Sequence, residues 1–161
     1  RVTNRVTPDP YSGDFTCTEK TVNGDTACYL YSTGAVTINT PQTISKKIVL
    51  LVDGDVNINQ NISINPGGLL VVLSGGNITL AETVSALQGV YLAQGTFNTG
   101  IYDTALTVNG TVVGLGNVNL QRTYNTNPGI PAEKFIFSPE YFSALPTTLY
   151  EQSRQWQEFA P

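Results

Sequence analysis

Hydrophobic and polar positions follow a short motif that recurs five times along the chain. In each copy a glycine precedes an apolar residue by two positions and, in four copies, a second apolar residue by four, with Thr or Asn between them. This alternation predicts a β-strand with its apolar side facing a core. The glycines are 19 to 22 residues apart, and such a repeat is typical of a solenoid with one repeat per coil. They are Gly34, Gly54, Gly76, Gly95 and Gly116.

A second strand is expected before each glycine, because the positions three, four and five residues earlier are apolar in almost every copy. A strand that is apolar on consecutive residues is buried on both faces, so one face would fill the solenoid and the other would be covered from outside. We expect the column four residues before the glycine to form a packing or interface face. Its members are Leu30, Leu50, Val72, Tyr91 and Val112.

A third, less regular strand in each coil is indicated by short apolar stretches such as residues 62–64 and 106–108, which are followed by turns. We therefore predict an all-β fold, a single right-handed parallel β-helix with three strands per coil and about five coils. A β-sandwich is the alternative, but antiparallel hairpins of varied register would not keep five glycines in step.

The chain divides into three parts by composition. Residues 1–16 are predicted to form an N-terminal arm or linker, residues 17–124 the β-helix, and residues 125–161 a proline-rich tail with a short helix. Ser138 is expected to be the N-cap, with Pro139 at the first helical position and Pro146 ending the helix. We expect the aromatic tail to pack on the apolar face of the solenoid; the alternative is that this face stays free for another chain.

Two cysteines, Cys17 and Cys28, lie eleven positions apart in a turn-rich stretch. An even number of cysteines in a chain of secreted character favours a disulfide, which would cap the first coil. Closing so short a loop would stabilise the fold by roughly 2–3 kcal/mol. The alternatives are a metal site, for which two cysteines and no histidine are too few ligands, or two separate thiols.

The composition of the chain excludes several classes of function. Only 12% of the 161 residues are charged, the net charge is −4, and no basic run is present, which argues against nucleic-acid binding. No run of about 18 apolar residues is present, so no membrane-spanning segment is expected. The uncharged polar surface is typical of secreted and surface proteins. The chain begins at Arg1 and contains no methionine, so we expect a processed mature protein or an excised module.

Candidate catalytic residues are few. The absence of histidine excludes Ser-His-Asp and Cys-His catalysis. Asp53 and Asp55 flank a repeat glycine and are the best candidates for a ligand site, but neighbouring coils add no second carboxylate there, and turn residues are the favoured interpretation. Too few oxygen ligands gather for calcium, so neither metal nor cofactor is expected. Three further charged residues do not join this column: Glu82, Asp103 and Arg122.

The tail also carries a resemblance. Four segments resemble the C-terminal β-helical module of large uncharacterised secreted or surface proteins of candidate-phyla (Patescibacteria-type) bacteria. They are the run Pro131-Ala-Glu-Lys-Phe-Ile-Phe-Ser-Pro-Glu-Tyr141, the pair Leu145-Pro146, residues 153–161 and the repeat segment 89–99. The resemblance covers residues 5–161 and implies a surface location without a mechanism. The strand–glycine rhythm is also loosely similar to the polymer-forming bactofilin-type β-helices, whose coils are shorter.

Two functional hypotheses follow. The first is a non-catalytic extracellular structural or surface module that self-associates, joins the domains of a parent protein, or forms part of a filament or adhesin. The alternative is a carbohydrate-binding or carbohydrate-active β-helix of the lyase or tailspike kind, with a glycan bound near Asp53 and Asp55. A phage fibre fragment is a third origin that the sequence does not separate from the first.

Overall fold

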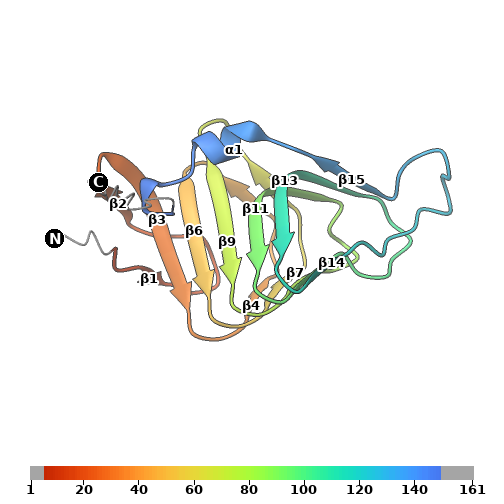
Figure 1. Cartoon of the computed structure of the whole chain (residues 1–161), viewed down its shortest axis with the longest axis horizontal. Coiled ribbons are helices and arrows are strands. Elements are labelled where there is room, and N and C mark those ends of the chain that lie inside the picture. Colours follow the sequence, from red (N-terminus) through yellow and green to blue (C-terminus); the bar gives the residue numbers. More distant parts are fainter. Residues whose placement is uncertain (1–5, 150–161) are drawn as a thin grey trace, which may run out of the picture.

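The fold of residues 6–149 is given by a computed structural model and is a parallel β-solenoid of about five coils (Figure 1). Its strands are β1 Asp9–Pro10, β2 Glu19–Val22, β3 Asp25–Ser32, β4 Val36–Ile38, β5 Gln42–Ile44, β6 Lys47–Val52, β7 Val56–Ile58, β8 Ile62–Ile64, β9 Leu69–Ser74, β10 Ile78–Leu80, β11 Ala86–Ala93, β12 Thr96–Asn98, β13 Leu106–Gly114, β14 Asn117–Asn119 and β15 Glu133–Ile136. A helix, α1 Pro139–Ser143, and a 3₁₀ turn, η1 Thr147–Leu149, follow the strands.

Three walls enclose the core. The long wall has the strand order β1-β3-β6-β9-β11-β13-β15, and the short wall has the order β14-β12-β10-β7-β4. The third wall begins with β5 and β8, and β8 continues onto the first half of β11, where Ile62 lies opposite Leu87. β15 pairs with the first half of β13, so the tail contributes a strand to the solenoid. These pairings between coils are parallel, as the repeat predicts.

The register of the short wall aligns the repeats as the sequence pattern predicts. Val36 lies opposite Val56, and Ile78 lies opposite both Val56 and Phe97. All four side chains belong to one continuous apolar cluster inside the solenoid, while the intervening Thr or Asn points outward. The interior is therefore a packed core, and the alternation of period two is its direct cause.

The repeat glycines lie where one corner of the solenoid packs on the preceding corner. A Cβ added at Gly54 would lie 2.8 Å from the backbone nitrogen of Ala35. One added at Gly116 would lie 3.0 Å from the carbonyl oxygen of Gly95. Gly34 has no such neighbour, because no equivalent corner precedes it. The spacing of the glycines therefore reflects backbone-to-backbone contact between coils.

The central column of the long wall points into the solenoid, so of the two expected roles it has the packing role. Four members of this column are buried in the core cluster, and Val112 is partly buried against it. The column contains Leu30, Leu50, Val72, Tyr91 and Val112. Side chains alternate along a strand, so the two flanking columns form the outer face of this wall. The buried members of this face are Ala27, Tyr29, Val49, Leu69 and Val71.

The tail covers part of this outer face. Tyr141 of α1 packs in the same cluster as Tyr29 and Val49, and Leu145 packs against it. The hydroxyl of Tyr29 lies 2.9 Å from that of Thr148 in η1. Figure 1 shows the tail returning from the C-terminal end of the solenoid across the long wall to β3.

The short helix begins as the sequence predicts and ends earlier. Ser138 precedes α1 and Pro139 is its first residue, but the Ser138 hydroxyl contacts Asn109 Oδ1 at 2.6 Å and does not cap a backbone N–H of the helix. The helix ends at Ser143, and η1 follows Pro146. Ser138 therefore ties the tail to β13, which is a tertiary role.

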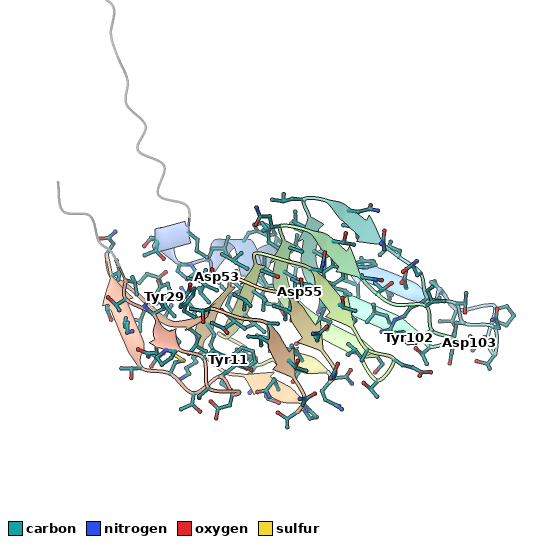
Figure 2. All side chains as sticks on the ribbon, turned by 90° about the horizontal axis from the view of Figure 1, so that it is seen from below. Tyr11, Tyr29, Asp53, Asp55, Tyr102 and Asp103 are labelled. Atoms are coloured by element: carbon teal, nitrogen blue, oxygen red, sulfur yellow. A yellow bond between two sulfur atoms is a disulfide. The ribbon has the colours of Figure 1, made fainter. Side chains whose placement is uncertain are left out.

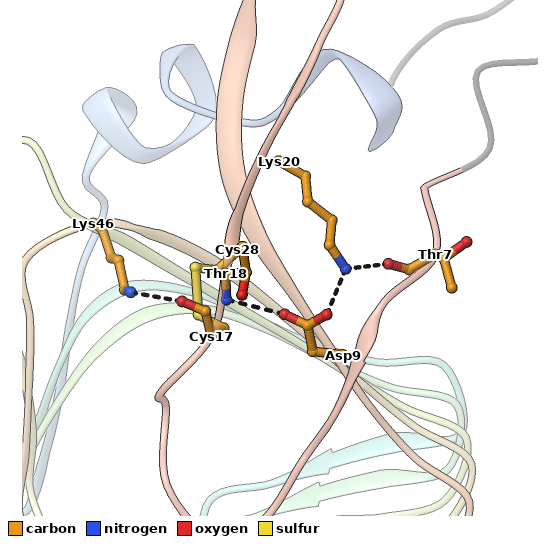
Figure 3. A network of polar contacts seen from close by, with 7 residues as sticks. All are labelled: Thr7, Asp9, Cys17, Thr18, Lys20, Cys28 and Lys46. Atoms are coloured by element: carbon orange, nitrogen blue, oxygen red, sulfur yellow. Dashed lines mark hydrogen bonds and ion pairs between the residues drawn. A yellow bond between two sulfur atoms is a disulfide. The ribbon is translucent and has the colours of Figure 1, made fainter.

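The N-terminal end of the solenoid is sealed. β1, within the segment expected to be an arm, pairs with β3, and the buried ring of Phe15 packs on the core. β2 pairs antiparallel with the first half of β3, and the disulfide between Cys17 and Cys28 joins the two segments (Figure 3). Nζ of Lys46 donates to the carbonyl oxygen of Cys17 at 3.3 Å. We call this arrangement the N-terminal cap.

Removal of the disulfide is expected to lower the free energy of unfolding by about 2–3 kcal/mol, because it closes a short loop that the unfolded chain would otherwise explore. The Cα atoms of Cys17 and Cys28 are 5.8 Å apart, within the usual range for a disulfide. The double variant Cys17→Ala/Cys28→Ala, measured by urea denaturation, tests this expectation. Reduced wild-type protein should behave like the variant, and a loss below about 1 kcal/mol would contradict the expectation.

Acid is expected to loosen the N-terminal cap. Oδ1 of Asp9 lies 2.6 Å from Nζ of Lys20, and Oδ2 accepts from the backbone N–H of Thr18 at 3.0 Å. The bond from Lys20, followed by that from Thr18, lowers the pKa of Asp9 below its ordinary value of 3.8. The stabilisation is therefore complete above pH 3.8 and is lost as the pH falls through the lowered pKa.

Hydrogen exchange of the β2 and β3 amides, measured as a function of pH, checks this expectation. Asp9→Asn should remove the acid-dependent change in local opening. Glu19→Gln, an exposed carboxyl in the same cap, serves as the matched control and should retain it.

Candidate functional site

The two aspartates that flank Gly54 lie at an exposed corner but engage different coils. The hydroxyl of Tyr31, in the preceding coil, donates to Oδ2 of Asp53, and this bond raises the pKa of Tyr31. Oδ1 of Asp55 accepts from the backbone N–H of Asn77, in the following coil, at 2.7 Å. The two carboxylates therefore serve neighbouring coils in opposite directions.

Asp55 begins a chain of side-chain bonds between corners. Oδ1 of Asn77, at the equivalent position of the next coil, accepts from the backbone N–H of Thr96 at 2.8 Å. Figure 2 shows Asp53 and Asp55 near the middle of the solenoid, with Asp103 well separated along its length. No opposed second carboxylate accompanies the pair among the described residues, so this corner holds coils together and lacks the geometry of a glycosidase.

No family model, curated protein or solved structure matches the chain.

Within residues 6–149 no three acidic or cysteine side chains come together in an arrangement that would hold a metal ion. Over the same range, no helix combines the length and apolar character needed to cross a bilayer. Any functional surface therefore has to be recognised by its own geometry.

A buried arginine holds the last coils together, a role that differs from those expected for the candidate site residues. The side chain of Arg122 is almost fully buried, and its guanidinium donates to three backbone carbonyl oxygens. Nη1 donates to Val84 at 2.6 Å, Nη2 to Ala81 at 2.9 Å and Nε to Thr99 at 3.0 Å. Burial lowers the pKa of Arg122, although a guanidinium stays charged at neutral pH.

Glu133 of β15 completes this cluster from the tail side. Its Oε1 accepts from the backbone N–H of Arg122 at 3.1 Å and from that of Gln121 at 3.2 Å, and it also contacts the hydroxyl of the buried Thr99. The guanidinium lies 5.6 Å from the centre of the Tyr102 ring. The guanidinium bonds lead to groups of the protein itself, so we interpret the cluster as structural. A lone arginine in a polar stretch gives no sequence signal of this role.

The outer surface of the short wall carries a shallow groove of about 350 Å³. Its polar lining comes from successive coils, with Thr37, Asn57 and Thr79 in one register column and Asn59 beside them. The Tyr102 ring also lines the groove. Amides, hydroxyls and an aromatic ring on a flat surface offer hydrogen bonds and a stacking face to a neutral polar ligand.

Among residues 6–149, nothing at the C-terminal end of the solenoid takes the place that the N-terminal cap has at the other end. Val56 and Ile78 of the inward column of the short wall are fully buried, but Val118 at the same position of the last coil is 36% exposed. Leu120 is 51% exposed, and Phe135, which lies opposite the buried Val108, is 38% exposed. Core positions are thus open to solvent. We call the surface formed by Val112, Val118, Leu120 and Phe135 the open end.

Proposed function

We propose that this chain is a non-catalytic structural module of an extracellular surface, which joins other subunits or parent domains through one end. The observation that carries this proposal is the difference between its two ends. The N-terminal cap covers the core with Phe15 and a disulfide-linked strand, whereas the open end exposes side chains of the core. Exposed contiguous apolar surface of this kind marks association sites in folded proteins.

Two further features support the extracellular setting. The disulfide between Cys17 and Cys28 is of the kind that persists in oxidising compartments. The outward positions of the short wall are Thr and Asn rather than charged residues. The resemblance of the tail to bacterial surface proteins points the same way, and the roles of filament or adhesin subunit belong to this proposal.

Electron microscopy of native material, with mass per particle measured in parallel, tests the proposal. Regular filaments or lattices, or labelling of this chain on the surface of intact cells or particles, is the expected result. A reduced, cytoplasmic protein without any larger assembly would overturn it. Thiol alkylation before and after reduction reports the state of Cys17 and Cys28 in the same material.

The groove on the short wall favours carbohydrate binding as a second function. A glycan array with wild-type protein is the first test, followed by the variant Asn57→Ala/Thr79→Ala, which is expected to lose binding. The variant Asp53→Ala/Asp55→Ala tests the corner instead and is expected to retain it. Loss of binding only in the second variant would move the site to the corner, and no binding by wild-type protein would remove this candidate.

A further inference from the structure

We propose that the open end binds the open end of a second copy of this chain, with β14 pairing antiparallel to its own symmetry mate about a two-fold axis. This inference rests on the proposed function and specifies its partner. The short wall would then continue from one copy into the next as a single sheet. The evidence lies in the backbone bonds, the sequence of β14, the charge of the last coils and the apolar area of the end.

Within the part of the chain that the structure describes, the backbone of β14 forms an edge of its sheet toward the open end. At this position of earlier coils the backbone N–H bonds the following coil: Val36 donates to the carbonyl oxygen of Asp55 at 2.9 Å. The N–H of Val118, which has no following coil, is instead taken by its neighbour's side chain, Oδ1 of Asn117, at 2.9 Å. A carbonyl oxygen from a partner strand would replace this local contact, as in strand addition at a sheet edge.

The sequence of β14 suits pairing with itself. Asn117-Val118-Asn119 reads the same in both directions, so a two-fold axis at Val118 places Val opposite Val and Asn opposite Asn. The N–H and C=O of Val118 face the partner, which makes the central pair a hydrogen-bonded one. The inward side chains of both copies then meet over one continuous core. An interface of this kind, with the same patch on both subunits, closes as a dimer.

Charge favours a second copy at this end. Residues 100–137 contain two acids, Asp103 and Glu133, and two bases, Arg122 and Lys134, for a net charge of 2 − 2 = 0. The net charge of −4 of the whole chain therefore lies elsewhere in the sequence. β14 itself carries no charged residue and no proline, the features by which edge strands usually avoid pairing.

Exposed apolar side chains at this end would contribute to the interface. A standard interface buries about 800 Å² on each partner, of which about 450 Å² is apolar. Val118, Leu120 and Phe135 supply part of this apolar area, together with Ile130 in the connection between β14 and β15, which is 49% exposed. Figure 1 shows this connection projecting at the same end of the solenoid.

The opposite end does not offer an equivalent surface. The inward side chains of the first coil, Val36 and Ile38, are buried, and Phe15 and the disulfide-linked β2 stand before them. A head-to-tail stack would place the open end against the N-terminal cap, whereas a tail-to-tail pair joins two open ends. The geometry therefore favours a closed dimer over an open filament of this chain alone.

Sedimentation equilibrium from micromolar to millimolar concentration tests the pairing. The wild-type chain is expected to dimerise, and Val118→Asp is expected to weaken the dimer at least tenfold, because two carboxylates would face each other across the axis. The matched control is Thr37→Asp on β4, the edge strand at the other end of the same wall, which should leave the dimer intact. Circular dichroism of each variant establishes that the solenoid is folded.

Cross-linking fixes the geometry independently. The only two cysteines of the chain form the native disulfide, so an introduced cysteine is its one free thiol. Cα atoms of a hydrogen-bonded antiparallel pair are about 5.5 Å apart, which a disulfide spans. Val118→Cys is therefore expected to form a covalent dimer on mild oxidation, and Thr37→Cys is not.

Three results would overturn the inference. The first is a wild-type chain that stays monomeric at millimolar concentration, and the second is a dimer that Thr37→Asp and Val118→Asp weaken equally. The third is cross-linking of Thr37→Cys to Val118→Cys in a mixture, which would indicate head-to-tail stacking. A monomeric chain in solution, beside native material that shows regular assemblies, would reject the two-fold pairing and leave the proposed function standing. A dimeric chain found in the cytoplasm would reject the proposed function and leave the two-fold pairing standing.

Discussion

Replacing Gly110 with alanine is expected to lower the free energy of unfolding by about 3–5 kcal/mol, through backbone strain and overpacking together. Gly110 has φ +141°, a conformation that residues with a side chain rarely adopt. Its added Cβ would lie 1.9 Å from the carbonyl oxygen of Gly89, the residue directly opposite in β11. Neither glycine can give way easily, because Gly89 is itself packed against Leu70 of the coil before.

Urea denaturation of Gly110→Ala against Gly34→Ala measures this effect. Gly34 is a repeat glycine at a corner, and no atom would lie within 4 Å of its added Cβ. The control is therefore expected to change stability by less than about 1 kcal/mol. Equal losses in the two variants would contradict the assignment of Gly110 to a backbone contact between coils.

Arg122→Met is expected to cost about 3–4 kcal/mol of folding stability, because buried carbonyl oxygens would lose their donors while the apolar stem keeps its volume. The orphaned acceptors would be the carbonyl oxygens of Ala81, Val84 and Thr99. Ala81 and Val84 lie in one turn after β10 and Thr99 lies in the following coil, so these two coils should loosen together. Thermal unfolding and hydrogen exchange of β12 to β14 would report this loosening.

Lys134→Met provides the matched control, because Lys134 is an exposed base on β15 in the same part of the solenoid. Its loss is expected to stay within about 0.5 kcal/mol, as for most surface substitutions. Arg122→Lys should fall between the two, since an ammonium is a point donor that cannot reach all three carbonyls in the guanidinium geometry. A stability equal to that of wild type in Arg122→Met would show that water replaces the guanidinium.

Much of the fold is predictable because glycines recur in the sequence where the backbones of neighbouring coils contact each other. The corner glycines and the alternation around Val36 and Val56 record where coils touch, and the observed register follows them. The sequence does not decide which face of the long wall points into the solenoid, because three consecutive apolar columns allow either face to be the core. Only the structure shows that Leu30 points inward and Tyr29 outward, beneath the tail.

Some roles of the candidate site residues could be predicted from the sequence and others could not, for similar reasons. The disulfide was predicted from spacing and is present. Asp55 could be interpreted as a turn residue, but its bond to Asn77 depends on coil stacking that spacing alone does not fix. Arg122 carried no signal, because its partners are backbone carbonyls, which every residue has. The open end was also hidden, since Val118 and Leu120 look in sequence like any other core positions.

The return of the tail across the long wall has a consequence for how the protein is made. The bonds that join it to the first coil connect residues 119 and 122 positions apart, Tyr29 to Thr148 and Asp25 to Thr147. A ribosome adding roughly 5–20 residues per second needs on the order of ten seconds to supply the second partner of each bond. The first coils stack during this interval with an apolar outer surface uncovered. This part of the outer surface therefore stays uncovered until residues 141–148 have been made.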